Sequence, residues 1–235
     1  MKDQAGEPSV ITIPRLERIP FVRHGFGDLT WREKDLRRLA DSLGFKPVFL
    51  NQVHSDVVHF IDQVPRRRLR GDAAVTRLTG LLLAIKTADC LPVILVEEER
   101  RVIAAVHCGW KGTSQRVLEK VVLGMEERHG ARPAAILAAF GPCIGKSCYE
   151  VGRDVLRAFS DSGFPESLFG PAAGRSGKYV FDLRSANRVQ LLKLGVRPEN
   201  IFSIDICTHC DRKYPSYRRD RDECGRMLTF IGLAA

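Results

Sequence analysis

The stretch LLLAIKTADCLPVILVEEERRVIAAVHCGWKGT, at residues 81–113, carries the strongest strand signal of this chain. It holds three apolar runs of strand length, at residues 81–87, 91–96 and 101–108, and a charged turn, EEER, separates the second from the third. Short apolar runs bounded by turn residues are typical of strands that are buried on both faces. We therefore predict three central strands, of which at least two are joined by a tight turn and run antiparallel.

Reactive side chains stand where these runs end. Asp89 and Cys90 lie at the corner between the first two runs, and His107 closes the third run just before Gly109. Glycine lets backbone or ligand approach closely, and a thiol with an imidazole at strand ends suits a metal site or a nucleophile. A buried thiol and a packed core histidine are the purely structural alternative.

The rest of the chain supplies enough apolar sequence for a large core. With 235 residues, 44% of them hydrophobic, and no linker-like segment, the chain is expected to form one domain over residues 1–235. Short strands and amphipathic helices do not alternate in a regular strand–helix–strand rhythm, which predicts a single α+β domain with a mixed sheet covered by helices. Apolar spacing and end signals place three of these helices at residues 31–43, from a cap at Thr113 or Ser114 to Gly130, and from a cap at Asp182 to residue 194.

The chain is basic, with 37 Lys and Arg residues against 28 Asp and Glu residues and a formal net charge of +9. This balance favours anionic partners such as phosphate or nucleotides. The densest basic cluster, RRRLR at residues 66–70, is better explained as a solvated loop than as a nucleic-acid contact, and the chain carries no recognisable nucleic-acid-binding motif. We therefore expect phosphate or nucleotides, in preference to nucleic acid, as partners.

The amino terminus has no apolar signal segment and no apolar run reaches the length of a membrane span, so we expect a cytoplasmic protein without a membrane partner. Seven cysteines in that setting indicate thiols or metal ligands and not disulfides. The sequence CTHC at residues 207–210 lacks a second ligand pair with zinc-ribbon spacing. We expect Cys207 and Cys210 to be non-catalytic thiols packed near a site.

Seven motifs occur together in this chain: NQVHSD, GDAAVT, TADCLPV, AVHCGWKGT, GPCIGKSCYEVG, FDLRSANRVQLL and CTHCD…SYRRD…GRM. In this order they resemble the YfiH-like family, also called the laccase-domain or polyphenol oxidase family, over roughly residues 20–235. The resemblance implies a fold like the catalytic domain of a cytotoxic necrotizing factor. It also implies a purine nucleoside phosphorylase that uses adenosine, inosine, guanosine or methylthioadenosine, with adenosine deaminase as a side activity.

The resemblance further implies a zinc ion held by His54, Cys90 and His107. Two imidazoles and one thiolate are the ligand composition of a catalytic zinc site whose fourth position is open to water or substrate. The same donors suit copper, which is the alternative occupant. A true laccase also needs a trinuclear copper cluster, and the four histidines that remain of the six are too few to supply it.

Substrate and phosphate contacts are expected from Asn51 in the NQVH motif and from the cationic Lys111, Arg184 and Arg218. Two other functions stay open at this stage. One is a cysteine hydrolase or amidase linked to peptidoglycan precursor editing, in which Cys90 is the nucleophile and His107 the base. The other is a nucleic-acid-binding protein. We expect a monomer whichever function holds.

Overall fold

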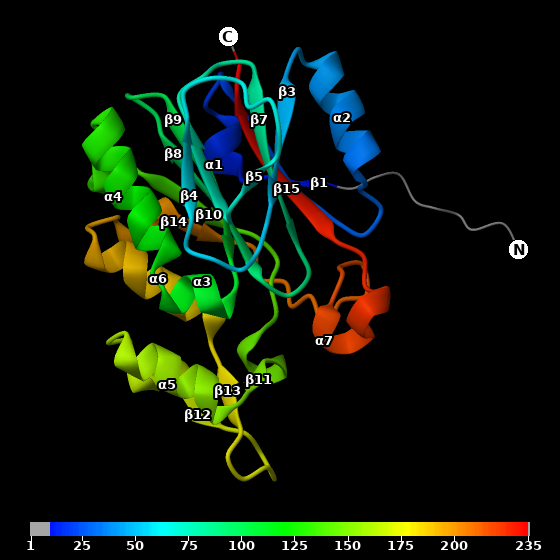
Figure 1. Ribbon diagram of the computed structural model, residues 1–235, viewed down its shortest axis with the longest axis vertical. Helices are drawn as coiled ribbons and strands as arrows, with labels where there is room; N and C mark the ends of the chain where they lie inside the picture. Colours follow the sequence, from blue (N-terminus) through cyan, green and yellow to red (C-terminus); the bar gives the residue numbers. More distant parts are fainter. Residues whose placement is uncertain (1–9, 235) are drawn as a thin grey trace, which may run out of the picture.

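The computed structural model describes residues 10–234, in which two six-stranded mixed sheets pack face to face (Figure 1). Helices α4 (Val117–His129) and α6 (Leu183–Lys193) cover one outer face, and α2 (Glu33–Ser42) covers the other. The apolar core is correspondingly layered, because one cluster lies between the sheets and one lies under the helices on each side. The predicted α+β class with mixed sheet and covering helices is confirmed, with two large sheets in place of one.

The first sheet is built from both ends of the described chain. Its order is β1 (Val10–Ile11), β2 (Val22–Gly27), β15 (Met227–Leu233), β7 (Leu81–Thr87), β3 (Lys46–Asn51) and β5 (Leu69–Arg70). Strand β3 is parallel to β7 and β5, and the other pairs are antiparallel.

The second sheet contains the other two predicted central strands. Its order is β14 (Ile201–Ser203), β10 (Leu137–Phe140), β8 (Leu91–Glu97), β9 (Val102–Cys108), β6 (Ala73–Thr76) and β4 (Val58–Ile61). Strands β8 and β9 are antiparallel, as predicted. Strand β7 lies in the first sheet, so the corner at Asp89 and Cys90 carries the chain from one sheet to the other.

Smaller elements complete the molecule. A three-stranded sheet of β11 (Glu150–Val151), β13 (Tyr179–Phe181) and β12 (Phe169–Pro171) lies with α5 (Arg153–Asp161) at one end (Figure 1). The short helices are α1 (Pro14–Glu17), α3 (Trp110–Ser114) and α7 (Tyr217–Asp220). None of the helices within residues 10–234 is both long and apolar enough to cross a membrane.

Strand β9 shows how the layers place a functional side chain. Val102, Ala104 and Val106 belong to the core under the helices, whereas Ile103 and Ala105 belong to the core between the sheets. Successive side chains of a strand point to opposite faces. His107 continues the second series, so its ring sits at the end of the space between the two sheets.

The helix ends agree with the sequence in one case and differ in another. The Asp182 side chain accepts a hydrogen bond from the Ser185 amide and caps α6, as predicted. The expected cap of α4 at Thr113 or Ser114 is wrong. The Thr113 hydroxyl pairs with Asn187 and the Ser114 hydroxyl donates to the Lys111 carbonyl, so the chain forms α3 there and α4 begins only after Arg116, in left-handed conformation.

Candidate metal centre and substrate pocket

The structure brings together the three residues expected to hold a metal. His54 follows β3, Cys90 lies between β7 and β8, and His107 is near the end of β9, yet their candidate ligand atoms all lie within 4.8 Å of one another. The Cys90 Sγ is 4.0 Å from the His54 Nε2, and the two imidazole rings meet edge to face with centroids 4.8 Å apart. Their role as metal ligands remains a prediction.

Unusual backbone conformations bring these side chains into contact. His54 has φ 58° and Asp89, next to Cys90, has φ 78°, both in the left-handed region that non-glycine residues rarely adopt. A Cβ on Gly109 would lie 3.1 Å from both the Cys90 Sγ and the His54 Cδ2. The predicted close approach at Gly109 is thus a contact with the cluster itself.

Asp72 organises the cluster, although sequence reasoning gave it no role. Its carboxylate accepts hydrogen bonds from the His54 amide at 3.0 Å, from the Ser55 amide and hydroxyl at 2.7 Å each, and from the His107 Nδ1 at 2.7 Å. Burial alone would raise the pKa of Asp72, but the hydrogen bonds from His107 and Ser55 outweigh it and hold that pKa well below its usual value. The GDAAVT motif was the signal that could have identified this residue.

The electrostatics of the site favour a thiolate beside a charged imidazole when no metal is bound. Burial opposes ionisation of Cys90, but the charge and hydrogen bonds of His107 and His54 lower its pKa to about 6. Burial likewise opposes charge on His107, but Cys90 and Asp72 raise its pKa to about 9. The pair therefore supplies a ready ligand or an activated nucleophile.

Asp89 anchors the Cys90 corner to later segments of the chain. Its carboxylate accepts hydrogen bonds from the Thr208 hydroxyl at 2.7 Å and from the Arg218 amide at 2.6 Å. Its carbonyl accepts one from the Ile144 amide at 2.9 Å. Three segments that are distant in sequence are thereby fixed around one thiol.

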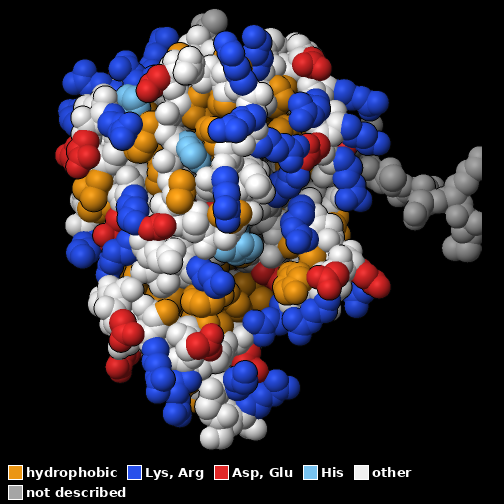
Figure 2. Space-filling model, viewed as in Figure 1, with side chains coloured by type: hydrophobic (Ala, Val, Ile, Leu, Met, Phe, Trp, Pro, Cys, Tyr) orange, Lys and Arg blue, Asp and Glu red, His pale blue; other side chains and the backbone are white. Residues whose placement is uncertain are grey.

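A cavity of about 570 Å³ opens above the cluster. Figure 2 shows a histidine side chain in the middle of this face, with Lys and Arg side chains around it. The lining combines the cluster with aromatic and cationic side chains, among them Trp110, Tyr149, Tyr217, Arg68, Lys86, Arg218 and Arg226. A concave site that combines aromatic side chains with convergent polar and charged groups is typical of small-molecule binding.

Two of the four expected substrate contacts line this cavity. Asn51 and Arg218 do so, and the Arg218 guanidinium lies 5.6 Å from the centroid of the Tyr149 ring. Lys111 lies over the Trp110 ring and is not a lining residue. Arg184 donates to the Asp205 carboxylate at 2.6 Å, which holds it in a structural ion pair outside the cavity.

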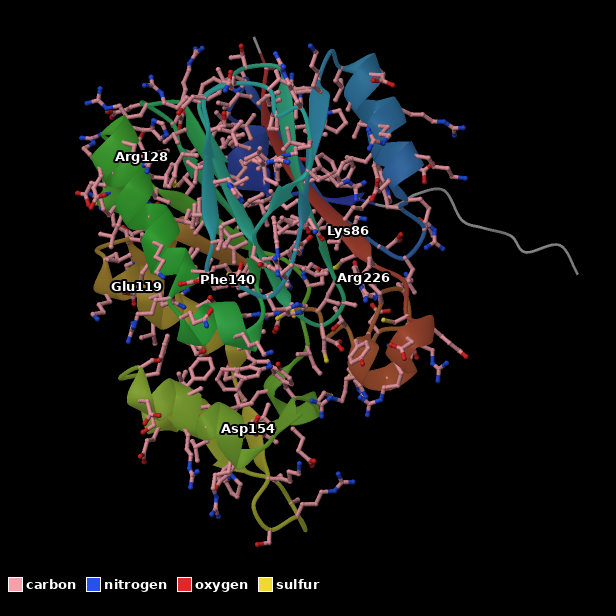
Figure 3. All side chains as sticks on the ribbon, in the orientation of Figure 1. Lys86, Glu119, Arg128, Phe140, Asp154 and Arg226 are labelled. Carbon is pink, nitrogen blue, oxygen red and sulfur yellow. The ribbon has the colours of Figure 1, made fainter. Side chains whose placement is uncertain are left out.

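Three lining cations were missed by sequence reasoning. Lys86 and Arg226 stand at the end of the first sheet that faces α7 (Figure 3), and Arg68 joins them at the cavity. Lys86 and Arg68 both form ion pairs with Glu33. Arg226 donates to the carbonyls of Cys224 and Gly225. Arg226 belongs to the GRM motif, which was the available signal.

Comparison with known proteins shows the family of this chain. A family model described as multi-copper polyphenol oxidoreductase laccase matches residues 31–234. A purine nucleoside phosphorylase from Deinococcus radiodurans is 43% identical over 200 residues, which is 83% of this chain and 75% of that protein. Adenosine deaminase RL5, from an unknown prokaryotic organism, is 39% identical over 219 residues, which is 87% of this chain and 83% of that protein.

A solved structure extends the similarity to three dimensions. The crystal structure of the hypothetical protein YfiH from Bacillus licheniformis matches with a TM-score of 0.88 at 28% sequence identity, covering 98% of each chain. The YlmD structure from Geobacillus stearothermophilus matches with a TM-score of 0.84 at 28% identity, covering 100% of this chain and 98% of that one. With the family model and the relatives in agreement, this chain belongs to the multi-copper polyphenol oxidoreductase laccase family, the YfiH-like family that its motifs predicted.

Proposed function

We propose that this protein is a zinc-dependent purine nucleoside phosphorylase that uses adenosine, inosine, guanosine or methylthioadenosine, with adenosine deaminase as a side activity. The observation that carries the proposal is the His54, Cys90 and His107 cluster at the base of a cavity lined by aromatic and cationic side chains. Relatives named purine nucleoside phosphorylase and adenosine deaminase support it.

The chemistry of the donor set fits zinc. Asp72 occupies the Nδ1 of His107, so the Nε2 is the ring atom left for a metal, and a carboxylate behind a ligating histidine is the usual supporting arrangement. When bound, zinc would act as a Lewis acid at its open fourth position. The other metal-like cluster within residues 10–234 consists of cysteines alone, which does not suit the trinuclear centre of a laccase.

The cavity walls supply what phosphorolysis requires from a protein. In this reaction a phosphate oxygen forms a bond to C1′ of the ribose while the bond from C1′ to the purine nitrogen breaks, giving ribose 1-phosphate and free base. Arg218, Arg226 and Lys86 would neutralise the phosphate charge. Tyr149 and Tyr217 offer faces on which a purine can stack, and Asn51 offers an amide for hydrogen bonding.

The decisive experiment is the phosphate dependence of base release. Adenosine or inosine should yield free base and ribose 1-phosphate only when inorganic phosphate is present, and arsenate should replace phosphate. Base release that is equally fast without phosphate would make the protein a nucleoside hydrolase instead.

A cysteine hydrolase is the second candidate, and one observation favours it. Cys90, His107 and Asp72 form a chain in which a thiol of lowered pKa lies beside an imidazole that a carboxylate orients. A metal-bound thiolate is not free to attack. If the protein reacts with no purine nucleoside and binds no zinc, the cysteine hydrolase function is therefore favoured.

A further inference from the structure

A cluster of three sulfur atoms lies apart from the proposed metal ligands His54, Cys90 and His107. Cys148 ends the 3₁₀ turn Lys146–Cys148, and Cys207 and Cys210 follow β14. Their three Sγ atoms all lie within 4.8 Å of one another, with 3.4 Å between Cys148 and Cys210, and all three are free cysteines. In the sequence, no second cysteine pair stands at zinc-ribbon spacing from CTHC. In the folded chain, Cys148, from the segment between β10 and β11, supplies a third thiol.

Backbone groups contact the sulfur of Cys207 and shape the turn that follows it. The Gly145 amide donates to the Cys207 Sγ at 3.2 Å, and a Cβ at Gly145 would lie 3.3 Å from the same sulfur. The amides of Cys210 and Asp211 donate to the Cys207 carbonyl at 3.1 and 3.0 Å, and this tight turn folds the second cysteine back beside the first. Amide hydrogen bonds to sulfur and a tight turn between two cysteines orient thiolates toward one point.

The distances and the number of thiols fit a metal better than a disulfide. At a zinc–sulfur distance of about 2.3 Å, two thiolates of a tetrahedral site lie about 3.8 Å apart, which is close to the observed spacing. A disulfide would use two of the thiols and leave the third without a role. Three thiolates select soft ions such as zinc or copper(I).

We propose that Cys148, Cys207 and Cys210 form a second metal site, which takes a thiophilic ion, with zinc as the ion to test. It is separate from the proposed nucleoside reaction and does not depend on it. The site joins two walls of the substrate cavity: Tyr149 follows Cys148 directly, and Thr208, between the other two ligands, donates to the Asp89 carboxylate at 2.7 Å. A metal bound there would fix the positions of these two cavity walls relative to each other.

The test is the zinc content of the full chain, purified in reductant so that no disulfide can form. Wild-type protein should retain about two equivalents of zinc. The His54→Ala, Cys90→Ala, His107→Ala variant should retain about one, and so should Cys148→Ser, Cys210→Ser. Cys224→Ser, which removes a thiol outside both clusters, is the matched control and should retain the wild-type amount.

Cobalt in place of zinc distinguishes the two sites by their light absorption, because thiolate-to-metal charge transfer grows with the number of thiolates. The proposed site has three and the first site one, so Cys148→Ser, Cys210→Ser should lose most of this absorption and Cys90→Ser little. The single variant Cys210→Ser, at an exposed position, keeps the test valid if the double variant does not fold.

Two results would overturn the proposal. One is a single equivalent of zinc in wild-type protein that disappears entirely in the first-site variant. The other is a Cys148–Cys210 disulfide in protein purified without reductant, combined with no second metal in reduced protein, which would make the cluster a redox pair.

Discussion

Asp72 is the residue on which the geometry of the candidate metal centre depends. Asp72→Asn keeps the size of the side chain but places an amide group where a carboxylate accepts hydrogen bonds from His54, Ser55 and His107. We expect zinc affinity to fall about 10-fold to 100-fold, as measured by competition with a chelator. Asp56→Asn, which alters an aspartate paired with Lys120 at the surface, should bind zinc as wild type does.

His107 is expected to be indispensable for turnover. In His107→Ala only two donors remain to hold zinc, which bind it weakly and leave its geometry undefined. Zinc at the first site and nucleoside turnover should therefore be lost together, as elemental analysis and product assays would show. His59→Ala is the matched control because His59 bonds to the Arg70 carbonyl and lies outside the cluster. Full turnover in His107→Ala would contradict the proposed metal site.

The cationic side chains can be ranked by their effect on the KM for phosphate. Arg226 lines the cavity, whereas Lys111, which the sequence favoured, does not. Loss of a charged hydrogen-bonding partner costs about 1.5–3 kcal/mol, so Arg226→Ala should raise the KM for phosphate about 10-fold to 100-fold. Lys111→Ala should change it little. The reverse ranking in a steady-state assay would restore the expectation from sequence and place phosphate on the Trp110 side.

The turn at residues 207–210, which follows β14, is expected to support the site without taking part in the chemistry. Its backbone is tied to Asp89 through Thr208 and to the Arg219 guanidinium, which donates to the carbonyls of Thr208 and His209 at 2.9 Å each. The cysteines of this segment belong to a cluster separate from Cys90.

Replacement of Cys207 and Cys210 by Ser should therefore lower the stability of the fold more than the rate of turnover. We expect a lower melting temperature, while turnover per folded molecule falls much less than in Cys90→Ser. Circular dichroism melts and activity normalised to folded protein would measure the two effects. A loss of turnover as large as that of Cys90→Ser would instead place these thiols in the active site.

One buried histidine makes the stability of the folded protein depend on pH. The His24 ring, on β2, accepts a hydrogen bond from the Ile13 amide at 2.8 Å, and burial lowers its pKa from 6.5 to about 4, although Glu17 opposes this shift. Between these values the unfolded chain takes up a proton that the folded chain does not. The free energy of unfolding should thus fall as the pH drops from 6.5 to 4, by up to about 3 kcal/mol.

Urea unfolding at pH 7 and pH 4.5 would measure this fall. His24→Gln cannot titrate, so its stability should depend less on pH in that window, even if the variant is less stable at neutral pH. Asp72 contributes at lower pH, because a carboxylate with a depressed pKa loses its stabilising effect only as the pH falls below its usual value near 3.8. Equal pH dependence in wild type and His24→Gln would contradict the assignment.

The local elements and the reactive residue types could be predicted from the amino-acid sequence alone. The apolar runs of β7, β8 and β9 are readable because each strand is buried on both faces, and Asp182 marks its helix because a cap depends on neighbouring residues alone. The resemblance of its motifs to a known family singled out His54, Cys90 and His107 for the same site.

Which distant residues meet could be seen only once the chain was folded. That the Cys90 corner joins two sheets, that Asp72 supports both histidines, and that Cys148 completes a thiol cluster all follow from strand pairing. Which cations line the cavity also depends on the fold, because Arg184 pairs with Asp205 whereas Arg226 lines the cavity. Periodicity and capping act over a few neighbouring residues, but contacts between segments depend on how the sheets assemble, which no local pattern encodes.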